Sequence, residues 1–292
     1  MVSMEQLGAA LQTGGKPSDA ELDVYGLTHQ GRRRASNQDH FLICALRRQV
    51  DLYHTSLPNA ADLAQRERLA FLAMVADGVS GDLGEEASRR AVEGITRYVT
   101  QSVRCVERAD EFDEERLAQS LEEAALLVHA GLLEQGTADA EPGYMATTLT
   151  LWLTVWPHAY LLQVGDSRCY VLRDDKLIQL SRDQTFAQDL IDAGALARSN
   201  AQQSRLAHIL SSAIGGPEAA PVVTRLHQPW SSVNLLCSDG LTKHVPDARI
   251  AERLQTMTSA KQVCEGLLQD ALDGGGSDNI TIIVGRAVRR TP

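Results

Sequence analysis

The stretch "MVADGVSGDLGEEAS" at residues 74–88 joins an apolar run to an abruptly polar segment. The apolar run begins at about residue 69 and predicts a buried strand over 69–77. Asp77 and Gly78 end this strand, and the spacing of apolar residues from Gly84 to about residue 101 predicts a helix. The stretch therefore places a carboxylate at the end of a buried strand, directly before a residue that has no side chain.

Two other apolar runs show the same arrangement. The run "VNLLCSDG" (233–240) ends at Asp239, and "GGGSDN" (274–279) places Asp278 just ahead of "ITIIV" (280–284). Each of these sequences, taken singly, is also a common turn. If the strand ends meet at one rim of a sheet, however, their carboxylates would repel one another unless a hard divalent cation such as Mg²⁺ or Mn²⁺ bound there. The pattern favours a divalent-metal site, with simple turns as the alternative.

The rest of the chain alternates between short strands and amphipathic helices. Strands are expected at 23–28, 40–46, 147–155, 159–166, 169–175, 176–183, 233–240 and 279–288, and helices at 112–135, 247–256 and 259–272. The polar segment 47–69 is expected to be a loop or insertion, and 184–213 to be mostly helical. The turn-separated strands over 159–183 predict an antiparallel meander, and the alternation in 147–155 predicts a half-buried strand. This order of elements indicates one α+β domain with helices packed outside sheet layers.

Composition argues against several classes of partner. The 292 residues carry a formal net charge of −10, which disfavours nucleic acid or an anionic membrane as the main partner. No apolar run approaches the roughly 18 residues of a membrane-spanning helix, and the N-terminus has no secretory-signal pattern, so a cytoplasmic location is expected. The five cysteines form no C-x-x-C pair, and Cys44, Cys169 and Cys237 lie in apolar runs, which predicts buried free thiols.

Six motifs occur in order along the chain. They are "RRRASNQD" (32–39), "VADGVSGDLGEEAS" (75–88), "ATTLT" (146–150), "VGDSRCYVLR" (164–173), "LCSDGLTKHV" (236–245) and "GGSDNITIIV" (275–284). Together they resemble the bacterial type 2C metal-dependent serine/threonine protein phosphatases, over residues 25–284. The resemblance implies an α-β-β-α sandwich of two antiparallel sheets flanked by helix pairs. It also implies a single phosphatase domain at 21–288 with a flap at about 184–217, a flexible N-terminal segment 1–20 and a tail 289–292.

The resemblance also implies roles for individual carboxylates. Asp77 would bridge two metal ions, and the carbonyl of Gly78 would complete the protein ligands of one of them. Asp239 and Asp278 would bind the other ion. Asp166, in "GDSR", would bind a third and weaker ion, with an ordinary hairpin turn as the alternative.

Other positions around these carboxylates have implied roles in binding substrate and water. Arg34 would hold the substrate phosphate, because a planar guanidinium suits phosphate oxygens. Asp39 would orient metal-bound waters. Gln38, which stands where many family members carry glutamate, is expected to face metal-bound water, with a plain polar turn as the alternative. Val79 stands where animal members carry a histidine that has been proposed as general acid.

For some neighbouring residues a purely structural role is expected. Arg33 is interpreted as a solvated turn residue, while Arg32 is left undecided. Thr147 and Thr148 are interpreted as strand residues whose hydroxyls pair locally.

The chemistry implied by the resemblance needs two Mn²⁺ or Mg²⁺ ions, with a third in some members. A hydroxide bridging the two ions would hydrolyse phosphoserine and phosphothreonine monoesters without a phosphoenzyme. The expected partners are phosphorylated proteins, above all a cognate serine/threonine kinase and its substrates, and the chain is expected to be a monomer. Two alternatives remain open: a pseudophosphatase that binds phosphoproteins without turnover, and a regulatory module whose acidic rim binds a structural ion.

Overall fold

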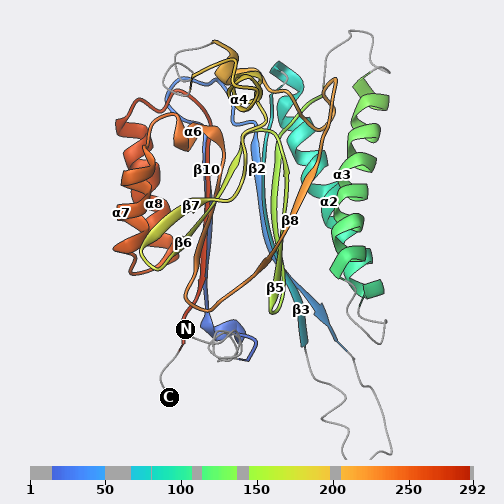
Figure 1. Cartoon of the computed structure of the whole chain (residues 1–292), viewed down its shortest axis with the longest axis vertical. Helices are drawn as coiled ribbons and strands as arrows, with labels where there is room; N and C mark the ends of the chain where they lie inside the picture. The colour runs from blue at the N-terminus through green and yellow to red at the C-terminus, as the bar shows by residue number, and fades with distance from the viewer. Residues whose placement is uncertain are drawn as a thin grey trace, which may run out of the picture.

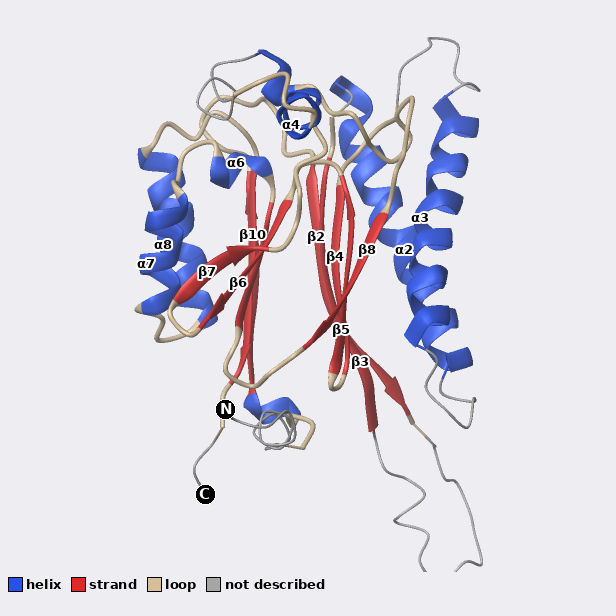
Figure 2. Cartoon of the chain, viewed as in Figure 1, coloured by secondary structure: helices blue, strands red, loops and turns tan. Residues whose placement is uncertain are grey.

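Two facing β-sheets with helices on their outer faces form the body of the protein (Figure 1, Figure 2). The computed structural model describes residues 15–49, 67–79, 81–106, 114–136, 145–197 and 205–289. Residues 1–14 of the N-terminal segment, most of the insertion predicted at 47–69 and residues 290–292 of the tail lie outside these ranges. The α-β-β-α sandwich is confirmed.

The strands divide into two antiparallel five-stranded sheets. The first sheet has the order β1-β10-β9-β6-β7, and the second has the order β2-β3-β4-β5-β8. The strands of the first sheet are β1 (Leu22–His29), β10 (Ile280–Ala287), β9 (Val233–Cys237), β6 (Arg168–Arg173) and β7 (Lys176–Gln179). Those of the second sheet are β2 (Asp39–Arg48), β3 (Glu67–Asp77), β4 (Leu149–Val155), β5 (His158–Val164) and β8 (Val222–His227).

Two helix pairs cover the outer faces of the sheets. Helices α2 (Gly84–Val106) and α3 (Glu114–Gly136) pack on the second sheet, and α7 (Asp247–Gln255) and α8 (Ala260–Asp273) pack on the first. All four helices were predicted, although α2 extends beyond its predicted end. Shorter helical segments lie between the main elements: η1 (Asp19–Glu21), η3 (Gly81–Leu83), α4 (Phe186–Asp192), η4 (Arg205–His208) and α6 (Asp239–Thr242).

Three apolar layers hold the sandwich together. The largest lies between the second sheet and helices α2 and α3, and it includes Leu72, Leu121 and Leu151. A second layer lies between the first sheet and helices α7 and α8. A third fills the space between the two sheets and includes Trp152 and Leu236. Fully burying one such side chain stabilises the fold by about 1.5–3 kcal/mol, so these layers supply the main driving force for folding.

Leu151 offers a test of the largest layer, because its side chain is fully buried in β4. Leu151→Ala is expected to lower the free energy of unfolding by about 3–5 kcal/mol, since the truncation removes buried surface and leaves a cavity. Leu127→Ala is the matched control on α3, where the side chain is 59% exposed and the expected change is below about 0.5 kcal/mol. Urea unfolding followed by circular dichroism measures both changes, and equal losses would contradict the placement of Leu151.

Strand β4 differs from its prediction at 147–155. It begins at Leu149, and both of its faces are buried. Leu151 and Leu153 belong to the layer under the helices, whereas Trp152 belongs to the layer between the sheets. The prediction of a half-buried strand was wrong because β4 lies in the middle of a sheet that is covered on both sides.

Strands β5 and β6 lie in different sheets, so the meander predicted over 159–183 is wrong. β5 pairs with β4 and β8, whereas β6 pairs with β7 and β9. The chain crosses between the sheets at Gly165, where φ is +102° and a Cβ atom would lie 2.7 Å from the side chain of Thr148. A crossing and a hairpin use the same turn residues, so the sequence pattern did not distinguish them.

The segment 184–213 is mostly irregular, which corrects the prediction of helix. Its helical parts are α4 and the short turn η4, and residues 198–204 lie outside the described ranges. The segment contains too few regularly spaced apolar residues to bury one face of a long helix, and short helices gain little stability without such packing. Strand β8 follows this segment and was not predicted.

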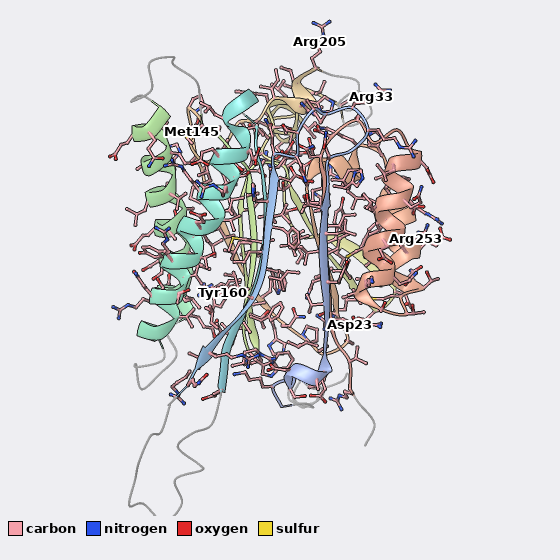
Figure 3. All side chains as sticks on the ribbon, turned by 180° about the vertical axis from the view of Figure 1, so that it is seen from behind. Asp23, Arg33, Met145, Tyr160, Arg205 and Arg253 are labelled. Atoms are coloured by element: carbon pink, nitrogen blue, oxygen red, sulfur yellow. The ribbon has the colours of Figure 1, made fainter. Side chains whose placement is uncertain are left out.

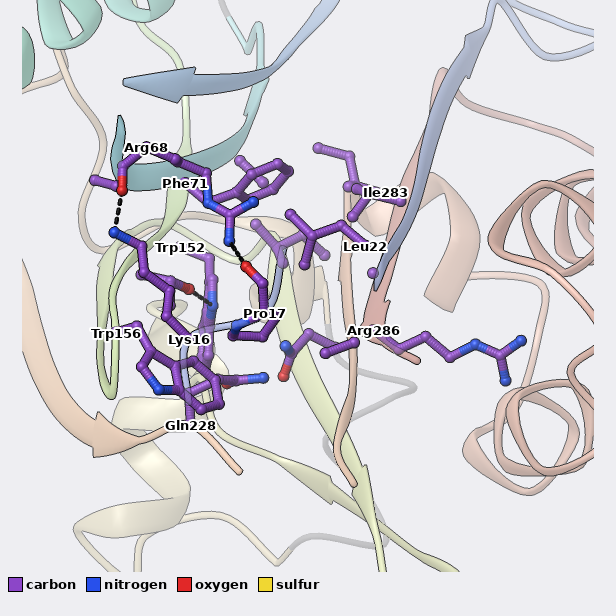
Figure 4. A pocket seen from close by; sticks show the side chains of 18 of the residues that line it. Lys16, Pro17, Leu22, Arg68, Phe71, Trp152, Trp156, Gln228, Ile283 and Arg286 are labelled. Atoms are coloured by element: carbon purple, nitrogen blue, oxygen red, sulfur yellow. Dashed lines mark hydrogen bonds between the residues drawn. The ribbon is translucent and has the colours of Figure 1, made fainter. Parts of the chain in front are cut away.

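The described part of the N-terminal segment packs at the lower end of the sandwich in Figure 1, opposite α4 and α6. The buried side chain of Arg68, in β3, donates to the carbonyl of Pro17 and pairs with the carboxylate of Asp19 at 2.5 Å. The ammonium of Lys16 donates to the carbonyl of Arg68, and a cavity of about 80 Å³ remains between the sheets (Figure 4). These contacts close this end of the sandwich.

The structure bears on two further predictions from composition. Cys169, Cys237 and Cys264 are buried free thiols, and Cys44 is half-buried and also free. Among the helices that the structure describes, none has both the length and the apolar character that a membrane crossing requires.

Candidate active site

Five aspartates gather where strand ends of both sheets meet, at the end of the molecule that carries α4 and α6 (Figure 1). Asp39 begins β2, Asp77 ends β3, Asp166 lies in the crossing from β5 to β6, Asp239 begins α6 directly after β9, and Asp278 precedes β10. The antiparallel register sets Asp39 opposite Asp77 on adjacent strands. The carboxylates at the strand ends therefore lie together at one rim, as the sequence predicted.

A pocket of about 990 Å³ opens at this cluster. The residues predicted for the site that line it are Arg34, Gln38, Asp77, Gly78, Asp166, Asp239 and Asp278. Asp39 is only 3% exposed and pairs across the strands with Asp77. The fold thus brings every residue predicted for the site to one place.

Burial and mutual repulsion raise the pKa of three of these carboxyl groups. Burial raises the pKa of Asp39 to about 6. Burial also raises the pKa of Asp77 well above its ordinary value, and the charges of Asp39 and Asp239 raise it further. Burial, together with the charge of Asp239, raises the pKa of Asp166 to about 8. The free energy needed to ionise these groups together falls when a cation binds among them.

Two cationic side chains of the protein pair with the remaining carboxylates. Arg34 donates to Asp278 through Nε at 2.6 Å and Nη2 at 2.8 Å. Lys243 Nζ lies 2.5 Å from Asp239 Oδ2 and 2.6 Å from Asp278 Oδ2. Although burial opposes it, these contacts lower the pKa of Asp278 to about 2. Among the residues that the structure describes, no three acidic, histidine or cysteine side chains are arranged as a ready-made metal site.

The donor atoms nevertheless suit a hard divalent cation. Asp39 Oδ1 and Asp239 Oδ1 are buried and make no hydrogen bond. A buried oxygen without a partner costs about 1–3 kcal/mol, and more when it is charged, which coordination to a cation would offset. Gly78 lets the backbone next to Asp77 pack closely against the start of α2, because a Cβ atom there would lie 2.2 Å from the carbonyl oxygen of Gly84. The residues present therefore fit a Mg²⁺ or Mn²⁺ site.

Asp39 is held by hydroxyl groups from the opposite sheet. Its Oδ2 accepts hydrogen bonds from Ser238 at 2.8 Å and from Thr281 at 2.6 Å. The sequence analysis named neither residue, although Ser238 directly precedes Asp239 and Thr281 lies in the run after Asp278. These two hydrogen bonds join the sheets at the pocket and leave Asp39 Oδ1 as the atom without a partner.

Thr147 and Thr148 fix the backbone of Asp77. Thr147 Oγ1 donates to the Asp77 carbonyl at 2.8 Å, and the Asp77 N–H donates to Thr148 Oγ1 at 3.1 Å. The prediction that these hydroxyls pair locally is correct only in part. Thr147 Oγ1 also donates to the carbonyl of Thr148 at 2.9 Å, but both hydroxyls contact Asp77, which is 70 and 71 residues away in the chain. Pairing of β3 with β4 brings the segments together.

Gln38 points toward the loop that follows Asp77. Its side-chain amide donates to the carbonyl of Gly81, and its backbone N–H donates to Asn279 Oδ1 at 2.9 Å. Asn279, which the sequence analysis did not name, also donates to the carbonyls of residues 30 and 36 and so holds the loop that carries Arg34. The interaction of Gln38 with metal-bound water stays a prediction.

The segment predicted to be a flap, 184–217, lines another side of the pocket. Phe186 and Ile209 expose 48% and 46% of their surface there. Gln184 anchors the segment next to Asp166, because its N–H donates to the carbonyl of Gly165 and its Oε1 accepts from the Gly165 N–H at 2.7 Å. Movement of this segment stays a prediction.

Comparisons with known proteins show similarity to one family of phosphatases. The family model described as "Protein phosphatase 2C" matches residues 53–274. The serine/threonine protein phosphatase PstP of Mycobacterium tuberculosis is 32% identical over 219 residues, which cover 75% of this chain and 41% of PstP. The serine/threonine phosphatase stp of Listeria innocua is 29% identical over 216 residues, which cover 73% of this chain and 83% of stp.

Solved structures show the same similarity. The crystal structure of the catalytic domain of PstP in complex with 2 manganese ions superposes with a TM-score of 0.68 at 27% identity, and the match covers 92% of this chain and 99% of that domain. The chain therefore spans less than half the length of full PstP and nearly all of its catalytic domain.

Proposed function

We propose that this chain, which belongs to the protein phosphatase 2C family, removes phosphate from phosphoserine and phosphothreonine in proteins with the help of divalent metal ions. The observation that carries the proposal is the gathering of five aspartates and Arg34 at one end of the sandwich, around one large pocket. The curated relatives named above are serine/threonine phosphatases, which supports the same reaction class for this chain.

The carboxylates of the pocket would hold the metal ions. Asp77, Asp239 and Asp278, with the carbonyl of Gly78, would hold two Mn²⁺ or Mg²⁺ ions, and Asp166 would bind a third. The 2 manganese ions in the related PstP domain support the binding of two such ions. Two such ions, when bound, lower the pKa of an attacking water and neutralise the charge of the phosphate, so that no covalent phosphoenzyme is needed.

The protein's own side chains would position the substrate and the water. The guanidinium of Arg34 already binds the carboxylate of Asp278 through two nitrogens. Phosphate oxygens can accept the same bidentate pair of hydrogen bonds. Asp39 is fixed through Oδ2 by two hydroxyls, so its Oδ1 is free to accept a hydrogen bond from a water in the pocket. The backbone of Asp77, held by Thr147 and Thr148, keeps its carboxylate at the same rim.

Phosphate release from a phosphothreonine peptide, with and without Mn²⁺, tests the proposal against its alternatives. A phosphatase releases phosphate when the metal is present. A pseudophosphatase would bind the peptide without releasing phosphate. A regulatory module with a structural ion would bind the metal but not the phosphopeptide, and either of these results would contradict the proposal.

Arg34→Ala is expected to raise KM for a phosphopeptide and to weaken inhibition by free phosphate. One charge-assisted contact is worth about 1.5–3 kcal/mol, so kcat/KM should fall by about ten- to a hundredfold. Steady-state kinetics and phosphate inhibition at saturating Mn²⁺ measure both effects. Arg33→Ala is the matched control, because Arg33 is exposed on the same loop and points outward (Figure 3). Equal losses in the two variants would show that diffuse positive charge acts here and not a specific contact.

The partners are proposed on the same grounds. Phosphorylated proteins, among them a cognate serine/threonine kinase and its substrates, suit a pocket that is large enough for a peptide segment. A monomeric state and a cytoplasmic location stay predictions.

A further inference from the structure

Lys243 brings a positive charge into the cluster of carboxylates. Its Nζ lies 2.5 Å from Asp239 Oδ2 and 2.6 Å from Asp278 Oδ2, and the side chain is 25% exposed in the pocket. An ammonium group donates three hydrogen bonds and accepts none. At this position it neutralises the same two carboxylates that would hold a metal ion.

The local backbone keeps Lys243 beside Asp239. Asp239 begins α6, and Lys243 follows one helical turn later, where its N–H donates to the Asp239 carbonyl at 2.9 Å. Side chains four residues apart on a helix are neighbours on its surface. Gly240 and Leu241 between them are buried, so the turn itself is held by packing. The backbone of α6 therefore places the ammonium within reach of the Asp239 carboxylate.

The cations are distributed unevenly over the pocket. Asp278 pairs with both Arg34 and Lys243, and Asp239 pairs with Lys243. Within the described ranges, no lysine or arginine forms an ion pair with Asp77 or Asp166. One half of the proposed metal site is thus partly neutralised by the protein, and the other half is not.

We propose that Lys243 competes with a divalent cation for Asp239 and Asp278 and thereby sets the metal affinity of that half of the site. The inference rests on the proposed function, because it takes these carboxylates as metal ligands. Two cations repel each other strongly at the same carboxylate oxygens, so a metal ion that binds there must displace the ammonium. An ion held by Asp77 and the carbonyl of Gly78 meets no such competitor, and the two ions therefore differ in affinity.

Lys243→Met tests this competition, because methionine is similar in length and carries no charge. Calorimetric titration of Mn²⁺ into metal-stripped full-length protein is expected to show Kd about tenfold lower in the variant at one site, within the range that groups contacting metal ligands produce. The other site should bind Mn²⁺ with unchanged affinity. In EDTA, the thermal midpoint of Lys243→Met should fall, because Asp239 and Asp278 lose their counterion, and saturating Mn²⁺ should remove this difference.

Lys261→Met is the matched control. Lys261 lies on α8 with its side chain 61% exposed, and it pairs only with Glu265 at 3.7 Å among the ion pairs of the described chain. The substitution removes the same unit of charge from the protein, so Kd should stay within about twofold of wild type if only local charge matters. If Lys243→Met does not fold, Lys243→Gln repeats the titration without the charge.

The outcomes separate the inference from the proposed function. Tighter binding in Lys243→Met but not in Lys261→Met supports the competition. Equal or weaker binding in Lys243→Met, with Mn²⁺ bound by the wild type, overturns the inference alone. Failure of both wild type and variant to bind Mn²⁺ overturns the proposed metal site and the inference with it.

Discussion

Asp239→Asn is expected to lower kcat for phosphopeptide hydrolysis by about a thousandfold while the protein stays folded. The amide has nearly the same size as the carboxylate, but it lacks the charge that would hold a metal ion at Asp239 Oδ1, a buried atom without a hydrogen-bond partner. A metal ion contributes several kcal/mol to stabilising the charge of the transition state, which corresponds to about three powers of ten in rate. Steady-state assays at saturating Mn²⁺, with circular dichroism as the check on folding, measure the effect.

Asp273→Asn is the control for this substitution. The Asp273 side chain is 63% exposed on α8 and makes a single ion pair, with Arg32 at 3.5 Å. The substitution makes the same chemical change away from the pocket, so kcat should change by less than about twofold. A rate near that of the wild type in Asp239→Asn would mean that the metal site lies elsewhere.

Removal of divalent cations is expected to abolish phosphate release, and added Mn²⁺ or Mg²⁺ should restore it. The carboxylates of the pocket repel a phosphate dianion as well as one another, so turnover requires cations between them. Assays in excess EDTA, followed by titration with Mn²⁺, measure the loss and the recovery. Full activity in EDTA would leave the metal mechanism without support.

The same titration should depend on pH, because protons compete with the metal. The pKa of Asp39 is raised to about 6 and that of Asp166 to about 8, so in the absence of metal both groups take up protons as the pH falls from 8 to 6. Protonation removes negative charge next to the ions that Asp77, Asp239 and Asp278 would hold, and an ion that binds at Asp166 must displace its proton, so the apparent affinity for Mn²⁺ falls with the pH. The Mn²⁺ concentration for half-maximal activity should therefore rise as the pH falls. If the Mn²⁺ concentration for half-maximal activity stayed constant from pH 8 to pH 6, protons and metal ions would not compete for these carboxylates.

The strand-end aspartates and the four long helices could be predicted because their signals are local. Asp77, Asp239 and Asp278 each lie next to an apolar run in the sequence. The helices show apolar residues at steps of three and four, which depend on no other part of the chain. The prediction of helix over 184–213 failed because it rested on composition alone. The polar residues of this segment are compatible with a helix, but the segment has no continuous apolar face that could pack against the sheets.

The remaining features of the site depend on contacts between distant segments. Three such features involve residues from segments whose sequence patterns are independent of each other. They are the crossing at Gly165 that brings Asp166 to the pocket, the hydrogen bonds of Thr147 and Thr148 to Asp77, and the ion pair of Lys243 with Asp278. Lys243 had one local signal, its spacing of four residues from Asp239, but the second carboxylate, that of Asp278, lies 35 residues later in the chain, just before β10.

Charged residues at the ends of buried strands, and helices that cover the sheets, can be predicted from the chain alone, because hydrophobic periodicity acts within each segment. The fold is needed to know which strands share a sheet, that Asp39 lies opposite Asp77, and that Lys243 lies between Asp239 and Asp278. These arrangements arise when the apolar faces of separate segments are buried together, and that burial depends on the whole chain at once.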